Sequence, residues 1–64
     1  MTPAEIKQAR QSLGLSQVDA ARLLGYGSQS RISEIESGQR NASESVLRLL
    51  AAYVAGYRPD DWPA

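Results

Sequence analysis

The segment Ser16–Gly38, SQVDAARLLGYGSQSRISEIESG, contains two runs of helix-forming residues joined by the short sequence GYGS. Serine is a favourable N-cap residue, and Ser16 and Ser28 each stand at the start of a run. Glycine commonly ends a helix, and Gly25 and Gly38 stand where the two runs stop. This punctuation predicts two short helices separated by a tight turn.

The spacing of apolar residues assigns the faces of these two helices. At about 100° per residue, three residues share one side of the first helix: Val18, Ala21 and Leu24. Leu23 falls toward the other side, and we expect it to be exposed. In the second helix we expect Ile32 and Ile35 to point inward together with Ser28. The opposite face of this helix carries Ser30, Ser33 and Ser37.

Helices are also predicted on both sides of this segment. Thr2 and Glu5 form a capping-box pattern at the start of a helix that carries apolar residues at helical spacing. Toward the other end, Asn41 is the expected N-cap of the longest helix, with Glu44 completing a second capping box. The tail 57–64 is flanked by prolines and has room for one helical turn at PDDW.

The length and composition limit the fold to one small all-α domain, 1–64. The chain has 64 residues, and no run alternates between apolar and polar residues as a strand would. We expect a compact bundle of four to five short helices. The longest apolar stretch is interrupted by Arg48, so no transmembrane span is expected. The first residues lack the pattern of a signal peptide, and we expect a cytoplasmic protein.

Enzymatic chemistry is not expected. The chain contains no histidine or cysteine, which removes the ordinary base for a serine nucleophile and the usual zinc ligands. Asp60 and Asp61 are adjacent and are expected to form a solvated turn rather than an acid/base pair. A helical domain of this size also has little room for a ligand cavity. We therefore predict no cofactor, no metal and no small-molecule ligand.

Several residues of the opening segment resemble the phage repressor/Cro-type helix-turn-helix family, also called the XRE family. The matching residues, in their order along the chain, are Gln17, Ala21, Gly25, Ile32, Ile35 and the ending IESG at 35–38. The resemblance extends from about Ile6 to Tyr53 and implies a lambda-repressor-like fold with its helix-turn-helix at about 17–37. Two departures are one additional residue between Leu24 and Ile32, near Tyr26 and Gly27, and Ala42 where many members have proline.

The resemblance implies that a recognition helix at about 28–37 enters the major groove of double-stranded DNA. The residues expected to read bases are Gln29, Ser30, Arg31, Ser33 and Glu34. The residues expected to contact phosphates are Gln17, Ser28, Gln39, Arg40 and Asn41. The resemblance also implies a partly buried ion pair between Arg10 and Glu36, for which the alternative is an exposed Arg10. Arg31 and Glu34 have an alternative as well, an ion pair on the helix surface.

The charge of the chain argues against strong non-specific binding to DNA. Seven basic and seven acidic residues give a formal net charge of +0, and affinity for phosphates depends on lysine and arginine. The exposed serines argue the other way, because they are weaker helix formers than lysine or glutamate but allow close approach to a groove. A thin basic edge is compatible with a neutral chain if the acidic residues lie elsewhere.

The expected function is sequence-specific DNA binding by a small transcriptional regulator, a repressor of prokaryotic or phage origin. Such proteins commonly bind as homodimers, and the candidate dimer surface is Tyr53, Tyr57 and Trp62. Trp62 has the alternative of folding back over its own core. A second hypothesis is a protein-interaction module, such as an adaptor, an anti-repressor or an antitoxin, with little DNA affinity of its own. The low charge and Leu23 favour this second hypothesis.

Overall fold

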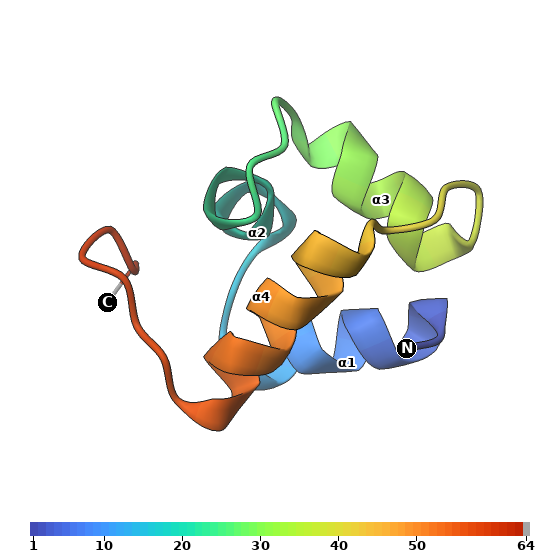
Figure 1. Ribbon diagram of the computed structural model, residues 1–64. Helices are drawn as coiled ribbons and strands as arrows, with labels where there is room; N and C mark the ends of the chain where they lie inside the picture. The colour runs from blue at the N-terminus through green and yellow to red at the C-terminus, as the bar shows by residue number, and fades with distance from the viewer. Residues whose placement is uncertain (64) are drawn as a thin grey trace.

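Helices provide all the regular secondary structure in the part of the chain that the computed structural model describes, residues 1–63. They are α1 (Pro3–Ser12), α2 (Gln17–Leu23), α3 (Gln29–Ser37) and α4 (Glu44–Ala55). Figure 1 shows α2 and α3 joined by a short turn, with α4 running between them and α1. The all-α class predicted from the sequence is confirmed. None of these four helices is long and apolar enough to cross a membrane.

Side-chain caps fix where the helices begin. The Thr2 hydroxyl accepts the backbone N–H of Glu5 at 3.2 Å, and the Glu5 carboxylate accepts the backbone N–H of Thr2 at 2.7 Å, which is the predicted capping box. Ser16 caps α2 through the N–H of Asp19 at 3.1 Å. The cap predicted for the last helix was wrong, because Ser43 and not Asn41 accepts the N–H of Val46.

The shift of this cap lengthens the connection between α3 and α4. Serine and asparagine are both good N-cap residues, so the sequence pattern alone did not separate the two positions. With Ser43 as the cap, Glu44 becomes the first helical residue and forms no capping box. Asn41 consequently lies in the loop that follows α3, where it is exposed.

The turn between α2 and α3 accommodates the additional residue near Tyr26. Gly25 has a φ of +85°, a left-handed conformation that favours glycine, and it reverses the chain after α2. The N–H of Tyr26 then donates to the carbonyl of Ala21 at 2.8 Å, which holds the turn against α2. Ser28 takes the N-cap position in extended conformation, but its side chain makes no cap hydrogen bond and is exposed. The expectation that Ser28 points inward was therefore wrong.

The two sides of α2 both contribute to the core, which differs from the predicted pattern. Leu23 is 8% exposed and packs with Leu15 and Tyr53, whereas Val18 is 59% exposed. The helix has only seven residues and is covered by α3 on one side and by α4 and the tail on another. Leu24 lies between these contacts and packs against all three clusters of buried residues. The buried arc is thus rotated away from Val18 and toward Leu23.

Two alanines set the close crossing of α2 and α3. Ala20 and Ala21 are each 3% exposed and form a buried cluster with Ile32 of α3. Small side chains at a crossing let two helices approach closely, and the aliphatic side chain of Ile32 fills the space between them. A second cluster, Ile6, Ile35 and Leu50, joins α3 to α1 and α4. These contacts leave one face of α3 uncovered.

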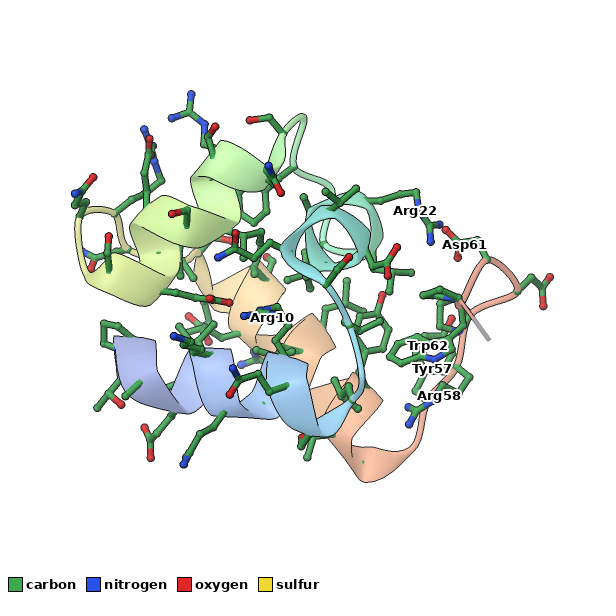
Figure 2. The ribbon with its side chains drawn as sticks, turned by 180° about the vertical axis from the view of Figure 1, so that it is seen from behind. Arg10, Arg22, Tyr57, Arg58, Asp61 and Trp62 are labelled. Carbon is green, nitrogen blue, oxygen red and sulfur yellow. The ribbon has the colours of Figure 1, made fainter. Side chains whose placement is uncertain are left out.

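An ion pair between Arg10 and Glu36 ties α1 to α3. The Arg10 Nε donates to Glu36 Oε2 at 2.6 Å and its Nη2 donates to Oε1 at 3.2 Å, while its Nη1 donates to the carbonyl of Leu15 at 2.9 Å. The two side chains are only 12% and 5% exposed, so each charge depends on the other for compensation. Figure 2 shows Arg10 pointing from α1 into the space between the helices.

The tail after α4 folds back over the core. Trp62 packs edge-on against Tyr53, with ring centroids 5.1 Å apart, and the Arg58 guanidinium lies 4.3 Å from the Trp62 ring centroid. Asp61 forms an ion pair with Arg22 of α2 at 3.0 Å. Figure 2 shows Asp61 beside Arg22 at the edge of α2, and Trp62 close to Tyr57 and Arg58 on the tail. The N–H of Trp62 closes one turn onto Pro59. The alternative that Trp62 covers its own core is therefore the one found.

We predict that Arg10→Ala destabilises the domain by about 3–5 kcal/mol, because it leaves the Glu36 carboxylate buried without its counter-charge. Lys7→Ala on the same helix is the matched control, since Lys7 is exposed and its loss should change stability by less than about 0.5 kcal/mol. Urea unfolding followed by circular dichroism measures both. The double variant Arg10→Met/Glu36→Leu should recover most of the loss. Equal stability of the Arg10→Ala and Lys7→Ala proteins contradicts the prediction.

A second prediction concerns Tyr53, whose buried hydroxyl donates to the Leu23 carbonyl at 3.1 Å. Burial of the ring, followed by the nearby Asp61 and Tyr57, raises the pKa of Tyr53 above its usual 10.0. The unfolded chain therefore releases the Tyr53 proton at a lower pH than the folded protein does. The protonated hydroxyl contributes its full stabilisation of the folded protein below about pH 10, and this stabilisation is lost at higher pH.

The test compares wild type with Tyr53→Phe. Loss of the hydrogen bond should cost about 1–2 kcal/mol at neutral pH. The difference between the two unfolding free energies should then shrink as the pH rises above about 10. Thermal unfolding across this range measures the effect, and a difference that stays constant up to about pH 11 contradicts it.

Candidate nucleic-acid interface

The uncovered face of α3 forms a shallow polar depression with the start of α2. Its lining residues are Gln17, Gln29, Ser30, Ser33 and Glu34. The fold thus brings one predicted phosphate-contacting residue of α2 together with four of the five residues predicted to read bases. The fifth, Arg31, is exposed on the same helix beside this depression. Two elements that are separated along the chain by the turn therefore share one surface.

Three of the side chains on this face of α3 are short. Ser30, Ser33 and Ser37 are all exposed, and the Ser37 hydroxyl donates back to the carbonyl of Glu34 at 3.1 Å. These hydroxyls share the face with the longer side chains of Gln29 and Glu34. A helix with such a surface can come close to a flat or grooved partner, and the hydroxyls can donate and accept hydrogen bonds there.

Gln17 is held in place from behind by Glu36. Its Nε2 donates to Glu36 Oε1 at 3.3 Å, the same oxygen that accepts from Arg10 Nη2. Spacing along the sequence does not indicate this contact, because it joins residues 19 positions apart on different helices. The Arg10–Glu36 ion pair consequently orients Gln17 as well as α3. Glu36 itself is turned away from the outer face and does not contribute charge to it.

The charged residues at the interface form a three-residue cluster. Glu34 Oε1 accepts from Arg31 Nη1 at 3.3 Å and from Arg40 Nε at 2.8 Å. The hydrogen bond from Arg40, together with the weaker one from Arg31, lowers the pKa of Glu34 despite partial desolvation, so the carboxylate is ionised at neutral pH. Two guanidiniums and one carboxylate give this part of the surface one net positive charge.

The loop after α3 places Arg40 beside Glu34. Gly38 has a φ of +87° and ends the helix, which turns the chain back along α3. The backbone N–H groups of Gln39 and Arg40 then donate to the carbonyl of Glu34 at 2.9 and 3.3 Å. The ion pair of Arg31 and Glu34, which was the alternative to base reading, is present, and Glu34 also contacts Arg40. A spacing of six residues is not a helical neighbour, and only the glycine turn brings the two together.

The predicted dimer surface requires a correction. Tyr53 is 2% exposed, and its ring is enclosed by its own protomer, so it is not available to a second chain. Trp62 is half-buried against it. Tyr57 stacks on Tyr53 at 5.9 Å but remains 55% exposed, and Val54 of α4 is 53% exposed. The exposed apolar surface near the end of α4 is therefore Val54 and Tyr57.

Comparison with known proteins gives one match. A family model described as Helix-turn-helix matches residues 6–62, which is most of the chain and includes all four helices except the first residues of α1. The comparisons with curated proteins and with solved structures gave no match. Together with the α2–turn–α3 geometry, the match shows that the chain belongs to the Cro/C1-type, or XRE, helix-turn-helix family of DNA-binding regulator domains.

Proposed function

We propose that this protein binds double-stranded DNA in a sequence-specific manner and acts as a small transcriptional repressor. The observation that carries the proposal is the shallow polar depression formed by Gln17 and α3, lined with polar side chains that include two serines and bordered by Arg31 and Arg40. In this proposal α3 enters the major groove while α2 crosses the DNA backbone. A protein seated in this way excludes others from the same site, which is sufficient for repression in a prokaryotic or phage-infected cytoplasm.

The proposed base readers differ in what they recognise. Gln29 lies exposed at the first position of α3 and can donate to and accept from the edge of adenine. Arg31 suits guanine, and Glu34 can accept from the amino group of cytosine. Ser30 and Ser33 are short enough to contact either type of base pair when the helix lies close to the groove floor.

The proposed phosphate contacts lie at the two ends of this surface. Gln17 opens α2, and Ser28 precedes α3 at the turn. On the other side, Gln39, Arg40 and Asn41 are exposed in the loop that the backbone of Glu34 holds against α3. A helix in the major groove that has phosphate contacts at both of its ends can bind the backbones of both DNA strands. These contacts fix the position of the helix along the duplex.

Binding as a homodimer is part of the proposal. Two copies related by a two-fold axis would contact half-sites about 34 Å apart. Val54 and Tyr57 are the exposed apolar residues that such a contact would cover. They lie at the end of α4 in the chain, and Figure 1 shows that this end of α4 points away from α3. Tyr53 is not part of this proposed dimer surface. Trp62 contributes only indirectly, because its contact with Tyr53 holds the tail against the core.

The alternative, a protein-interaction module, has its own observation in its favour. Val18 is 59% exposed at the edge of a second shallow depression that includes Tyr26 and Gly27 of the turn. An apolar side chain in such a position suits a protein partner. Leu23, which favoured this alternative in the sequence, is buried and no longer supports it.

Binding to random duplex DNA distinguishes these functions. The DNA-binding proposal predicts weak but measurable affinity for a 20-base-pair duplex at about 50 mM salt that declines as the salt concentration rises to about 200 mM. Absence of binding at the lower salt concentration, with the protein folded, contradicts the proposal and favours the interaction module.

A second prediction separates base readers from phosphate contacts. Gln29→Ala should weaken binding to the preferred sequence by about 1–3 kcal/mol and leave random DNA nearly unaffected. Arg40→Ala should weaken binding to both and reduce the slope of affinity against salt by about one phosphate contact. The preferred sequence is first obtained by selection from a random library with the wild-type protein. Equal losses on both DNAs for Gln29→Ala contradict its assigned role.

A further inference from the structure

We infer that Glu34 acts as a built-in counter-ion that occupies Arg31 and Arg40 and thereby suppresses binding to DNA of the wrong sequence. This inference rests on the proposed DNA-binding function and assigns one of its residues a role in specificity. Glu34 would lower the affinity for random DNA more than it lowers the affinity for the preferred sequence. In the free protein the Glu34 carboxylate accepts the arginine hydrogen bonds that a phosphate oxygen would accept in a non-specific complex.

The geometry of the cluster supports this role. The Arg31 guanidinium, which precedes Glu34 in the sequence, comes from α3, and the Arg40 guanidinium comes from the loop that follows α3. Both donate to the same oxygen, Oε1, at 3.3 and 2.8 Å. Phosphate and carboxylate oxygens accept from guanidinium in the same way, so a phosphate at this place competes directly with Glu34.

The position of Arg40 does not depend on the Glu34 side chain alone. Its backbone N–H, with that of Gln39, donates to the carbonyl of Glu34, and the turn at Gly38 sets the direction of the loop. Replacing the carboxylate by an amide therefore leaves the loop in place and changes the charge. This separation allows the electrostatic role of Glu34 to be tested without moving Arg40.

The exposure of the cluster makes the exchange with DNA feasible. Each arginine side chain is 47% exposed and that of Glu34 is 33% exposed, so these ion pairs are in contact with water and are weak. A phosphate can therefore draw either arginine away. On random DNA the carboxylate is then left near negative charge without a donor, which opposes binding. On the preferred sequence a base amino group can donate to it and offset that repulsion.

The test compares Glu34→Gln with Asp61→Asn, which removes one negative charge from another exposed ion pair with an arginine. Figure 1 shows the tail that carries Asp61 on the opposite side of the molecule from α3. Affinity is measured by fluorescence anisotropy on a 20-base-pair duplex of random sequence and on the duplex selected by the wild-type protein. Circular dichroism establishes that each variant is folded.

We expect Glu34→Gln to raise the affinity for the random duplex about three- to tenfold at about 50 mM salt and to steepen the salt slope by about one phosphate contact. The ratio of selected to random affinity should fall. Asp61→Asn should change either affinity by less than about twofold, because Asp61 is paired with Arg22 and lies on the tail, away from α3. In an Arg40→Ala background the gain from Glu34→Gln should be strongly reduced, since one of the released arginines is absent.

Three results would overturn the inference. Equal gains for Glu34→Gln and Asp61→Asn would indicate a general effect of net charge. A lower affinity of Glu34→Gln for random DNA would show that the carboxylate contributes to binding instead of opposing it. Failure of the wild type and both variants to bind either DNA at low salt would overturn the proposed function together with the inference, whereas the first two results leave DNA binding intact.

Discussion

The buried carboxylate of Glu36 is the constraint on which the arrangement of this domain depends. An ionised group that is 5% exposed must be compensated, and Arg10 supplies two hydrogen bonds to it while also binding the carbonyl of Leu15. Gln17 donates to the same carboxylate from the start of α2. One acidic side chain thus fixes the positions of α1, of the α1–α2 connection, of α2 and of α3 relative to one another. This small domain has few buried residues, and apolar contacts have little directional preference. The hydrogen bonds of Glu36 therefore specify the relative orientation of the helices more narrowly than apolar packing alone.

The two glutamates of α3 are two residues apart and therefore lie on nearly opposite sides of the helix. Glu36 faces inward, where Arg10 neutralises it, and Glu34 lies at the outer face between two exposed arginines. The same residue type consequently has a structural role at one position and an electrostatic role at the other. The serines of α3 place small side chains on its outer face. The alanines of α2 allow α2 to pack close to α3, so that Gln17 at the start of α2 lies on the same surface. The interface is a consequence of how the inner face is packed.

Local patterns predicted the parts of this structure that depend on neighbours in sequence. The capping box of Thr2 and Glu5 and the inward position of Ile32 and Ile35 follow from spacing within one helix. The failures have a common cause in contacts between elements. Leu23 is buried because the tail and α4 cover a second side of a seven-residue helix, which its own periodicity does not record. Arg40 reaches Glu34 only because Gly38 reverses the chain. In the candidate site the common outer face of the α3 residues was predictable from their spacing, whereas their pairing with the loop required the fold.

The ion pairs show how the opposite charges behind the zero net charge of the chain are arranged. In the described residues, five arginines form ion pairs with four carboxylates, and the two arginines at the candidate interface share Glu34. A protein with its guanidiniums already paired gains little from phosphates as such, because each new contact replaces an existing one. Under the proposed function, its affinity for DNA would then depend on contacts that only the correct bases provide and on the simultaneous binding of two copies. Such a domain would spend little time on random DNA, and a small number of molecules would suffice to occupy a preferred site.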